Sequence, residues 1–338
     1  MSVPMRVLVT GGAGFIGMHA ALALAAQGAD VVALDSFDPY YDVALKQARA
    51  WKLARAARIE FRRHDLADAE TTSALFVEGA YTHVVHLAAQ PGVRYSLSNP
   101  TAYLRNNVDA FGNVLEGCRH AQVSHLVYAS SSSVYGGNHV LPFSEDQPTD
   151  TPVSLYAATK KANELMAYSY AHLFGLPATA LRFFTVYGPW GRPDMAPMLF
   201  TRAILAGTPI KVFNHGDMRR DFTYVDDIVE GVTRVLALPP QPDAASGARH
   251  AIYNIGNNRS VALPEFIATL ETLLGKTALR VDEPMQPGDV KETYASIDRL
   301  SALTGFTPRT ALADGLAKFV DWYHGYYTKD TGFPLSRE

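Results

Sequence analysis

The sequence has little cysteine: Cys118 is the only one among 338 residues. One thiol cannot form an intrachain disulfide, and it excludes a cysteine-rich zinc site. The 11 histidines are scattered without the spacing of metal ligands, so we expect no metal. A reducing compartment suits such a chain, and we therefore expect the protein to be cytoplasmic.

The sequence also lacks an excess of charge and a long hydrophobic run. A formal net charge of −3 gives no reason to expect nucleic acid or a membrane surface as the main partner. The apolar stretch from Phe15 to Leu34 is interrupted by His19, Gln27 and Asp30, so it does not predict a membrane span. The N-terminus shows no basic, apolar and cleavage-site pattern of a secretory signal.

Apolar segments rich in β-branched residues alternate with helical patterns through the first half of the chain. Near-continuous apolar strands separated by helices indicate a parallel sheet that is covered on both faces. We therefore predict an α/β fold with a doubly wound parallel sheet of the Rossmann type. The predicted strands are Met5–Thr10, Val31–Asp35, Ile59–His64, His83–Leu87, His125–Ser130, Ala178–Phe183 and Ala251–Ile255.

The composition changes near residue 190, where Pro, Gly, Asp and Arg become frequent. We predict that residues 1–190 form mainly a dinucleotide-binding domain and that residues 191–338 form mainly a smaller, mixed substrate-binding region. Residues 251–255 are expected to return to the main sheet. Helical patterns are predicted at Phe15–Gln27, Pro100–Ala121, Met198–Ala206, Asp227–Leu238 and Pro264–Leu274.

A glycine-rich loop, Gly11–Gly17, follows the first predicted strand and opens a helix. Glycines at Gly11, Gly14 and Gly17 let the backbone approach a pyrophosphate, and the free N–H groups of the helix N-terminus face that anion. Asp35 ends the second strand, where a carboxylate accepts hydrogen bonds from the adenosine ribose and repels a 2′-phosphate. The pattern therefore predicts NAD, in preference to NADP. The loop also contributes Phe15 and Ile16 to the predicted cofactor site.

Three further residues follow the third and fourth predicted strands at the same sheet edge. Asp65 and Leu66 are expected to flank the adenine, and Ala88 is small enough to leave room for the cofactor. An aspartate after a strand is also a common helix cap, and a small residue also serves close packing.

Tyr156 and Lys160 lie one helical turn apart on one face of a predicted helix. A cation beside a phenol stabilises the phenolate and lowers the phenol's pKa, which suits Tyr156 to removing a proton from a hydroxyl group. The spacing alone is a weak signal. A serine run, Ser130–Ser133, ends the fifth strand on the edge where ligands bind in open parallel sheets. A hydroxyl there could relay a proton to Tyr156.

The sequence resembles the extended short-chain dehydrogenase/reductases, and within them the nucleotide-sugar 4-epimerases, especially the UDP-glucuronate 4-epimerases. The resemblance rests on VTGGAGFIG, HLAAQPGVRYSLSNP, YASSSSVYG, PVSLYAATKKANELMA, LRFFTVYGPWGRPDMA and RRDFTYVDDIVEGV. It implies a catalytic set of Ser131, Tyr156 and Lys160, with Ser132 and Ser133 touching the substrate. It also implies bound NAD as cofactor, with Lys160 holding the nicotinamide ribose, and a UDP-sugar as substrate.

In such epimerases, the 4-hydroxyl of the sugar is oxidised, the 4-keto sugar turns, and hydrogen returns to its other face. A glucuronate substrate passes through a β-keto acid, which loses carbon dioxide readily when its carboxylate bond aligns with the carbonyl π system. Thr185 and Arg192 are the expected clamp that prevents this alignment. Arginine offers a planar fork that binds a carboxylate at two points.

Four other residues are implied as substrate contacts by the same resemblance. Arg220 is expected at the diphosphate and Lys211 along the uridine, Asp289 is expected to close over the nucleotide, and Arg94 is expected to approach the sugar or its carboxylate. The resemblance further implies a homodimer formed through helices near Tyr103–Arg119 and Leu155–Leu173.

Other functions remain open at this point. A UDP-glucuronate decarboxylase shares the substrate and the oxidation step, and a neutral UDP-hexose 4-epimerase would not need Arg192. A 4,6-dehydratase carries carboxylates where this chain has Ser131–Ser133, which argues against it. A non-catalytic, NAD-sensing regulatory protein would not need the proton acceptor Tyr156.

Overall fold

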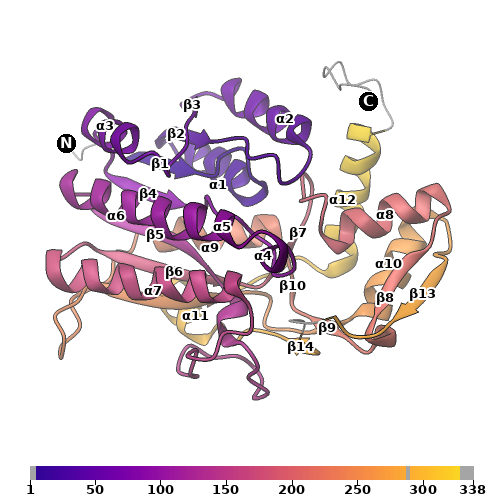
Figure 1. Ribbon diagram of the computed structural model, residues 1–338. Coiled ribbons are helices and arrows are strands. Elements are labelled where there is room, and N and C mark those ends of the chain that lie inside the picture. The colour runs from indigo at the N-terminus through magenta and orange to yellow at the C-terminus, as the bar shows by residue number, and fades with distance from the viewer. Residues whose placement is uncertain (1–4, 287–289, 328–338) are drawn as a thin grey trace.

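A computed structural model of the chain describes residues 5–286 and 290–327. Its centre is a sheet of seven strands in the order β11-β6-β5-β4-β1-β2-β3, and every pair of neighbours is parallel (Figure 1). The prediction of a doubly wound parallel sheet is confirmed. The seven strands are β1 (Arg6–Thr10), β2 (Asp30–Asp35), β3 (Ile59–Arg63), β4 (His83–His86), β5 (His125–Ser131), β6 (Ala178–Phe183) and β11 (His250–Ile255).

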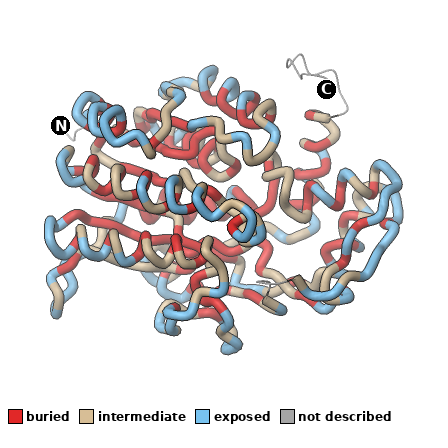
Figure 2. Tube along the Cα trace, viewed as in Figure 1, coloured by how far each residue is buried: buried red, intermediate tan, exposed pale blue. Residues whose placement is uncertain are grey.

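The inner strands β1, β2, β4, β5 and β6 are mostly buried because helices cover both faces of the sheet, whereas the edge strand β3 carries Glu60, Arg62 and Arg63 and is partly exposed (Figure 2). In β1, Val7 and Val9 belong to one hydrophobic cluster, whereas Leu8 between them belongs to the other. This alternation follows from the two-residue repeat of a strand. Full burial of each such side chain contributes roughly 1.5–3 kcal/mol, so the central sheet is a rigid platform for the residues at its edge.

Helices cover both faces of the sheet (Figure 1). On one face α1 packs against α9, and on the other face α6 lies between α3 and α7. Their bounds are α1 (Phe15–Ala26), α2 (Val43–Ala54), α3 (Ala69–Gly79), α6 (Ala110–His120), α7 (Leu155–Phe174) and α9 (Val225–Leu236). The predicted start of the first helix at Phe15 is confirmed.

The segment predicted as one helix over Pro100–Ala121 is divided in the structure. It contains α5 (Pro100–Tyr103), a π-helical turn η1 (Leu104–Asp109) and then α6; a short helix, α4 (Tyr95–Ser98), precedes it. The wider turn directs Asn107 inward, where its amide oxygen accepts from the Gln90 backbone at 2.7 Å and its Nδ2 donates to Thr159 Oγ1 at 3.1 Å. Such π-helical turns are often found at functional sites, and this one ties the end of β4 to α7.

The later part of the chain builds a smaller mixed region beside the sheet (Figure 1). Its strands pair as β10 with β7, as β12-β9-β14, and as β13 with β8. They are β7 (Thr185–Tyr187), β8 (Ile210–Phe213), β9 (Arg219–Arg220), β10 (Phe222–Tyr224), β12 (Val261–Ala262), β13 (Arg280–Glu283) and β14 (Glu292–Thr293). Its helices are α8 (Ala196–Ala206), α10 (Leu263–Leu274), α11 (Asp298–Thr304) and α12 (Leu312–Tyr327).

Two features of this region bear on the domain division. β11 joins the main sheet beside β6, and α9 packs on the main sheet next to α1, although both follow residue 190 in the chain. The division near residue 190 stays a prediction. Across residues 5–286 and 290–327, every helix is too short or too polar to cross a membrane.

Candidate active site

The glycine loop lies at the point where the strand order reverses, between β1 and its neighbours β2 and β4. A Cβ atom at Gly17 would lie 2.0 Å from the carbonyl oxygen of Gly11, and one at Gly14 would lie 2.8 Å from the same atom. Gly11 itself has a φ of 70°, which favours glycine. The loop is thus folded tightly against the start of α1, where no side chain caps the helix, so its first N–H groups remain for a ligand.

This packing predicts the effect of adding one methyl group. Gly17→Ala should destabilise the protein by about 3 kcal/mol and abolish retention of a dinucleotide, because the new Cβ meets backbone and not a movable side chain. Gly137→Ala is the matched control, since a Cβ there meets nothing within 4 Å. Thermal unfolding and nucleotide retention would be measured on both. A stable, dinucleotide-retaining Gly17→Ala variant would contradict the close approach.

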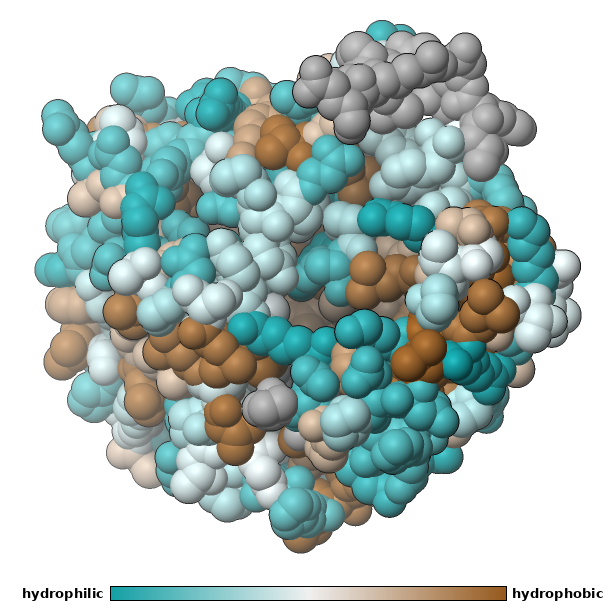
Figure 3. All heavy atoms as spheres, turned by 45° about the vertical axis from the view of Figure 1, so that its right-hand side comes forward, coloured by the Kyte–Doolittle hydropathy of each residue, from teal (hydrophilic) through white to brown (hydrophobic). Residues whose placement is uncertain are grey.

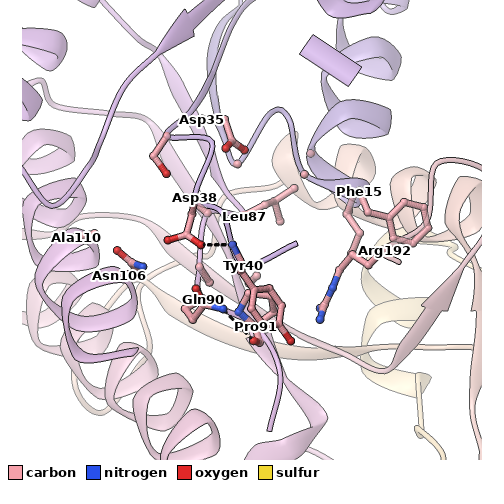
Figure 4. Close-up of a pocket in the computed structure, with 18 of the residues that line it drawn as sticks. Phe15, Asp35, Asp38, Tyr40, Leu87, Gln90, Pro91, Asn106, Ala110 and Arg192 are labelled. Atoms are coloured by element: carbon pink, nitrogen blue, oxygen red, sulfur yellow. Dashed lines mark hydrogen bonds between the residues drawn. The ribbon is translucent and has the colours of Figure 1, made fainter. Parts of the chain in front are cut away.

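One cleft opens from this loop across the carboxyl edge of the sheet, and Figure 3 shows a hollow near the centre of this face. Its wall includes both the predicted cofactor residues and the predicted catalytic residues, and Figure 4 shows part of it. The predicted residues that line it are Gly11, Gly14, Phe15, Ile16, Gly17, Asp35, Asp65, Leu66, Ala88, Ser131, Tyr156, Lys160 and Arg192.

Asp35 stands at the end of β2, in the wall of the cleft. Its Oδ2 accepts from the Ala13 N–H at 3.2 Å and its Oδ1 accepts from the Phe37 N–H at 2.9 Å. Burial raises the pKa of this carboxyl, and the nearby positive charge of Lys46 opposes the rise. The carboxylate is therefore oriented by the glycine loop itself.

Asp65 also has a defined partner. Its Oδ2 accepts from Arg105 Nη2 at 2.6 Å, and its Oδ1 accepts from the Ala67 N–H at 3.0 Å. The carboxylate thus stabilises the turn that carries Leu66 while lining the same cleft.

Ser131 and Tyr156 both line the cleft and are hydrogen-bonded to each other. Ser154 begins α7, because its hydroxyl accepts from the Ala157 N–H at 3.1 Å, and this cap places Tyr156 in the first turn. Ser131 ends β5, and its Oγ donates to Ser133 Oγ at 3.1 Å. Burial raises the pKa of the Tyr156 phenol, while its hydrogen bond with Ser131 and the charge of Arg192 act in the opposite direction.

The expected tuning of Tyr156 by Lys160 differs from what the structure shows. Lys160 is buried, its Nζ donates to the Ala129 carbonyl oxygen at 3.0 Å, and burial lowers its own pKa to about 8. The two side chains share a helix face, but loss of hydration dominates both groups. The pKa of Tyr156 is raised, so the prediction of a lowered pKa is wrong.

The pKa of Lys160 predicts a pH dependence of stability. Since the folded value of about 8 lies below the value of an unfolded lysine, near ~10.4, the folded chain binds fewer protons between these values. Burying the ammonium costs stability fully below pH ~8, and this cost disappears as pH rises toward ~10.4. The Lys160→Met variant should therefore melt at a higher temperature than the unsubstituted protein at pH 8, and this difference in melting temperature should shrink as the pH rises to 10. A constant difference would contradict the buried ammonium.

Arg192 reaches the cleft from the loop after β7. Hydrogen bonds from Arg49 to the backbone just before Arg192 hold this loop in place. Arg49 of α2 is fully buried, and its guanidinium donates to the carbonyl oxygens of Ala13 at 3.0 Å and Trp190 at 2.6 Å. It also donates to the Gly191 carbonyl oxygen at 3.2 Å. One buried cation therefore joins the glycine loop to the loop that carries Arg192.

Thr185 lies next to the cleft without lining it. Its neighbours Phe184 and Val186 both belong to the wall, and successive side chains of a strand point to opposite sides. The Thr185 N–H donates to the Asp221 carbonyl oxygen at 3.1 Å, which ties β7 to the start of β10. Its expected role in the clamp stays a prediction.

The other predicted substrate residues lie outside the wall of this cleft. Ser132 and Ser133 begin the short helix η2 (Ser132–Tyr135) directly after Ser131. Arg94 lies with its guanidinium carbon 4.5 Å from the ring centroid of Phe213, which places it beside β8. Their substrate contacts stay predictions.

Two more of these residues belong to the smaller region. Lys211 is on β8 and is largely exposed, with its Nζ 3.6 Å from Glu283 Oε1. Arg220 is on β9, and its Nη1 donates to the Lys291 carbonyl oxygen at 3.0 Å. Asp289 lies outside the described residues.

The structure also brings residues to the cleft that sequence reasoning missed. The turn after β2 supplies Asp38, Tyr40 and Tyr41, and α2 supplies Lys46 (Figure 4 labels Asp38 and Tyr40). The tandem tyrosines Tyr40 and Tyr41, which directly follow Pro39 after the second predicted strand, were the signal available in the sequence. Within the described residues, no group of three or more His, Cys, Asp or Glu side chains could hold a metal ion.

This combination of a glycine loop, an acidic residue ending β2 and a Tyr–Lys pair on one helix face defines a dinucleotide-dependent enzyme of the Rossmann type. Residues 7–256 match the NAD dependent epimerase/dehydratase family. The chain belongs to that family.

Three similar proteins match this chain over nearly its whole length. Protein CapI from Staphylococcus aureus is 50% identical over 335 residues, which cover 96% of this chain and 100% of that protein. A probable UDP-glucuronate 4-epimerase from Rhizobium meliloti is 46% identical over 336 residues, 96% of this chain and 98% of that one. One similar structure is the crystal structure of a UDP-glucuronic acid 4-epimerase from Bacillus cereus in complex with UDP-glucuronic acid and NAD. It matches this chain with a TM-score of 0.87 and 34% sequence identity, and the match covers 96% of this chain and 100% of that chain.

Proposed function

We propose that the protein is an NAD-dependent UDP-glucuronate 4-epimerase, which interconverts UDP-glucuronate and UDP-galacturonate through a 4-keto sugar. The observation that carries the proposal is the convergence of Tyr156, Ser131 and Arg192 on the cleft that begins at the glycine loop. This arrangement supplies a proton acceptor, a hydroxyl relay and a carboxylate-binding cation in one place. The relatives named above support the choice of substrate.

The residues present fit a bound NAD. The contact distances at Gly14 and Gly17 show a loop with no room for side chains, and the uncapped start of α1 leaves N–H groups for the pyrophosphate. Asp35 would accept from the adenosine ribose, Asp65 and Leu66 would flank the adenine, and Lys160 would hold the nicotinamide ribose. When bound, NAD supplies the oxidant that takes hydrogen from C4 and gives it back.

The chain's own groups handle the proton. Tyr156, as phenolate, takes the proton of the 4-hydroxyl, and Ser131 hydrogen-bonds both oxygens and relays the proton between them. Burial raises the pKa of Tyr156, so the Ser131 hydrogen bond and the positive charge of Arg192 are the features of this chain that favour the phenolate. The same phenol returns the proton when the sugar has turned.

Arg192 meets the second requirement of the reaction, which is to control the orientation of the sugar carboxylate. A β-keto acid loses carbon dioxide only when its carboxylate bond lies parallel to the carbonyl π system. A guanidinium that binds the carboxylate at two points holds it away from this alignment. Thr185, one strand position from the cleft wall, is proposed as the second member of the clamp.

Incubation with UDP-glucuronate and NAD, followed by NMR of the sugar, tests the proposal. UDP-galacturonate supports it. UDP-xylose or a 4-keto pentose would replace it with a decarboxylase, and conversion of UDP-glucose but not UDP-glucuronate would replace it with a neutral-sugar epimerase. No product from any UDP-sugar would support the NAD-sensing protein.

We also propose a homodimer in the cytoplasm. Large apolar side chains lie exposed on the outer face of α7, with Leu165 58% and Leu173 67% accessible. Two copies that pair α6 and α7 would bury them in a four-helix interface. The single cysteine, Cys118, is buried and free, which suits a reducing compartment.

A further inference from the structure

Arg192 already has a carboxylate partner inside the chain. Its Nε donates to Asp194 Oδ1 at 3.0 Å and its Nη2 donates to Asp194 Oδ2 at 2.5 Å. These two parallel hydrogen bonds form the fork geometry that is typical of arginine and carboxylate. The side chains are only 21% and 28% exposed, so the pair belongs to the protein interior more than to its surface.

The carboxylate of Asp194 is itself held by a distant segment. Tyr40, in the turn after β2, donates its phenol hydrogen to Asp194 Oδ2 at 3.0 Å. The Tyr40 ring packs against the Tyr95 ring with centroids 4.7 Å apart, and its backbone N–H donates to Asp38 Oδ1 at 2.9 Å. Burial and the charge of Asp194 raise the pKa of Tyr40 to about 12, so the phenol remains a donor near neutral pH.

The order of these residues relative to the cleft matters. Arg192 and Tyr40 line the cleft, whereas Asp194, which is hydrogen-bonded to the guanidinium, lies outside its wall (Figure 4 shows Arg192 and Tyr40). A guanidinium has five N–H donors, and Asp194 takes two of them. The remaining donors suffice for a second carboxylate.

We propose that Asp194 and Tyr40 are positioning residues that fix the guanidinium plane of Arg192, so that its remaining donors meet the carboxylate of an acidic sugar. This inference rests on the proposed function. A free arginine side chain loses rotamer entropy on binding, and a partner that orders it beforehand removes much of that cost. By orienting Arg192, Asp194 and Tyr40 favour binding of acidic over neutral sugars. They also keep the substrate carboxylate out of the alignment that releases carbon dioxide.

Two variants test the proposal. Asp194→Asn removes the charge and one of the two acceptors of the fork, and Tyr40→Phe removes the phenol that is hydrogen-bonded to both Asp194 and Arg192. Two ratios would be measured: carbon dioxide released per UDP-galacturonate formed, and kcat/KM for UDP-glucuronate against UDP-glucose. We expect Asp194→Asn to raise the first ratio and lower the second by about tenfold, and Tyr40→Phe to change both in the same directions by roughly threefold.

Matched controls separate positioning from general stability. Asp30→Asn breaks an exposed pair with Arg58, and Tyr81→Phe removes a buried phenol that has no hydrogen-bond partner. Neither should change the ratios. A merely structural role for Asp194 and Tyr40 would lower the melting temperature and leave both ratios unchanged, which would overturn the positioning proposal alone. Failure of the unsubstituted protein to form UDP-galacturonate would overturn the proposed function, and this inference with it.

Discussion

Tyr156→Phe is expected to reduce kcat about 1,000-fold while the cofactor remains bound. The substitution removes the only group of the proposed site that accepts the 4-hydroxyl proton, and a positioned acid or base contributes typically 10²–10⁴-fold. The ring itself stays, and with it the edge-to-face contact with Tyr103 at a centroid distance of 6.1 Å. The glycine loop and Asp35 are untouched, so nucleotide retention should not change.

Tyr170→Phe is the matched control for this experiment. Tyr170 lies on the same helix, α7, and its phenol donates to Glu116 Oε1 at 2.5 Å, outside the cleft wall. Its kcat should remain within about twofold of the unsubstituted protein. Rates of the sugar reaction and the amount of bound NAD would be measured together. Full activity of Tyr156→Phe would remove Tyr156 from the role of proton acceptor.

Arg192→Ala is expected to shift the products from epimerisation toward carbon dioxide release by roughly 10- to 100-fold. Hydrogen bonds to a charged group are worth about 1.5–3 kcal/mol, and each ~1.4 kcal/mol is a factor of ten in the ratio of two rates. Without the guanidinium, the carboxylate of the 4-keto sugar rotates into alignment with the carbonyl. Since the positive charge of Arg192 also opposes the rise that burial causes in the pKa of Tyr156, the total rate should fall as well.

Arg192→His tests whether the planar fork of the guanidinium is required. An imidazole cannot offer the two parallel donors of a guanidinium, so it should also raise the share of carbon dioxide release. Arg58→Ala, which removes an exposed cation paired with Asp30, serves as the control. Trapped carbon dioxide and the NMR signals of UDP-galacturonate give the ratio. Unchanged partitioning in both Arg192 variants would remove Arg192 from the clamp.

The sequence predicted the local parts of this site well, because short-range rules determine them. The spacing of Gly11, Gly14 and Gly17, the aspartate that ends β2, and the Tyr156–Lys160 pair all depend on a single strand-turn-helix unit or on one helical turn. The parallel sheet then brings the ends of β1, β2 and β5 to one edge, and the structure confirms this sheet.

The remaining features depend on contacts between distant segments or on burial, which local patterns do not encode. Tyr40 meets Asp194 across 154 positions of the chain, and Arg49 reaches Trp190 across 141. The pKa of Lys160 follows from its desolvation, and the helical pattern near Asn107 does not reveal a π-helical turn that hydrogen bonds to Gln90 stabilise. In each case tertiary packing determines the contact, the pKa or the helix type, and the spacing of residues in the sequence does not.

Conversion of UDP-glucuronate that carries deuterium at C4 tests the central claim most directly. If Tyr156 handles only the proton and the C4 hydrogen leaves and returns within one cleft, NMR should show UDP-galacturonate that still has deuterium at C4 and all six sugar carbons. Loss of the deuterium to solvent would contradict oxidation and return at C4. A five-carbon product would contradict the role of Arg192 as the group that protects the carboxylate.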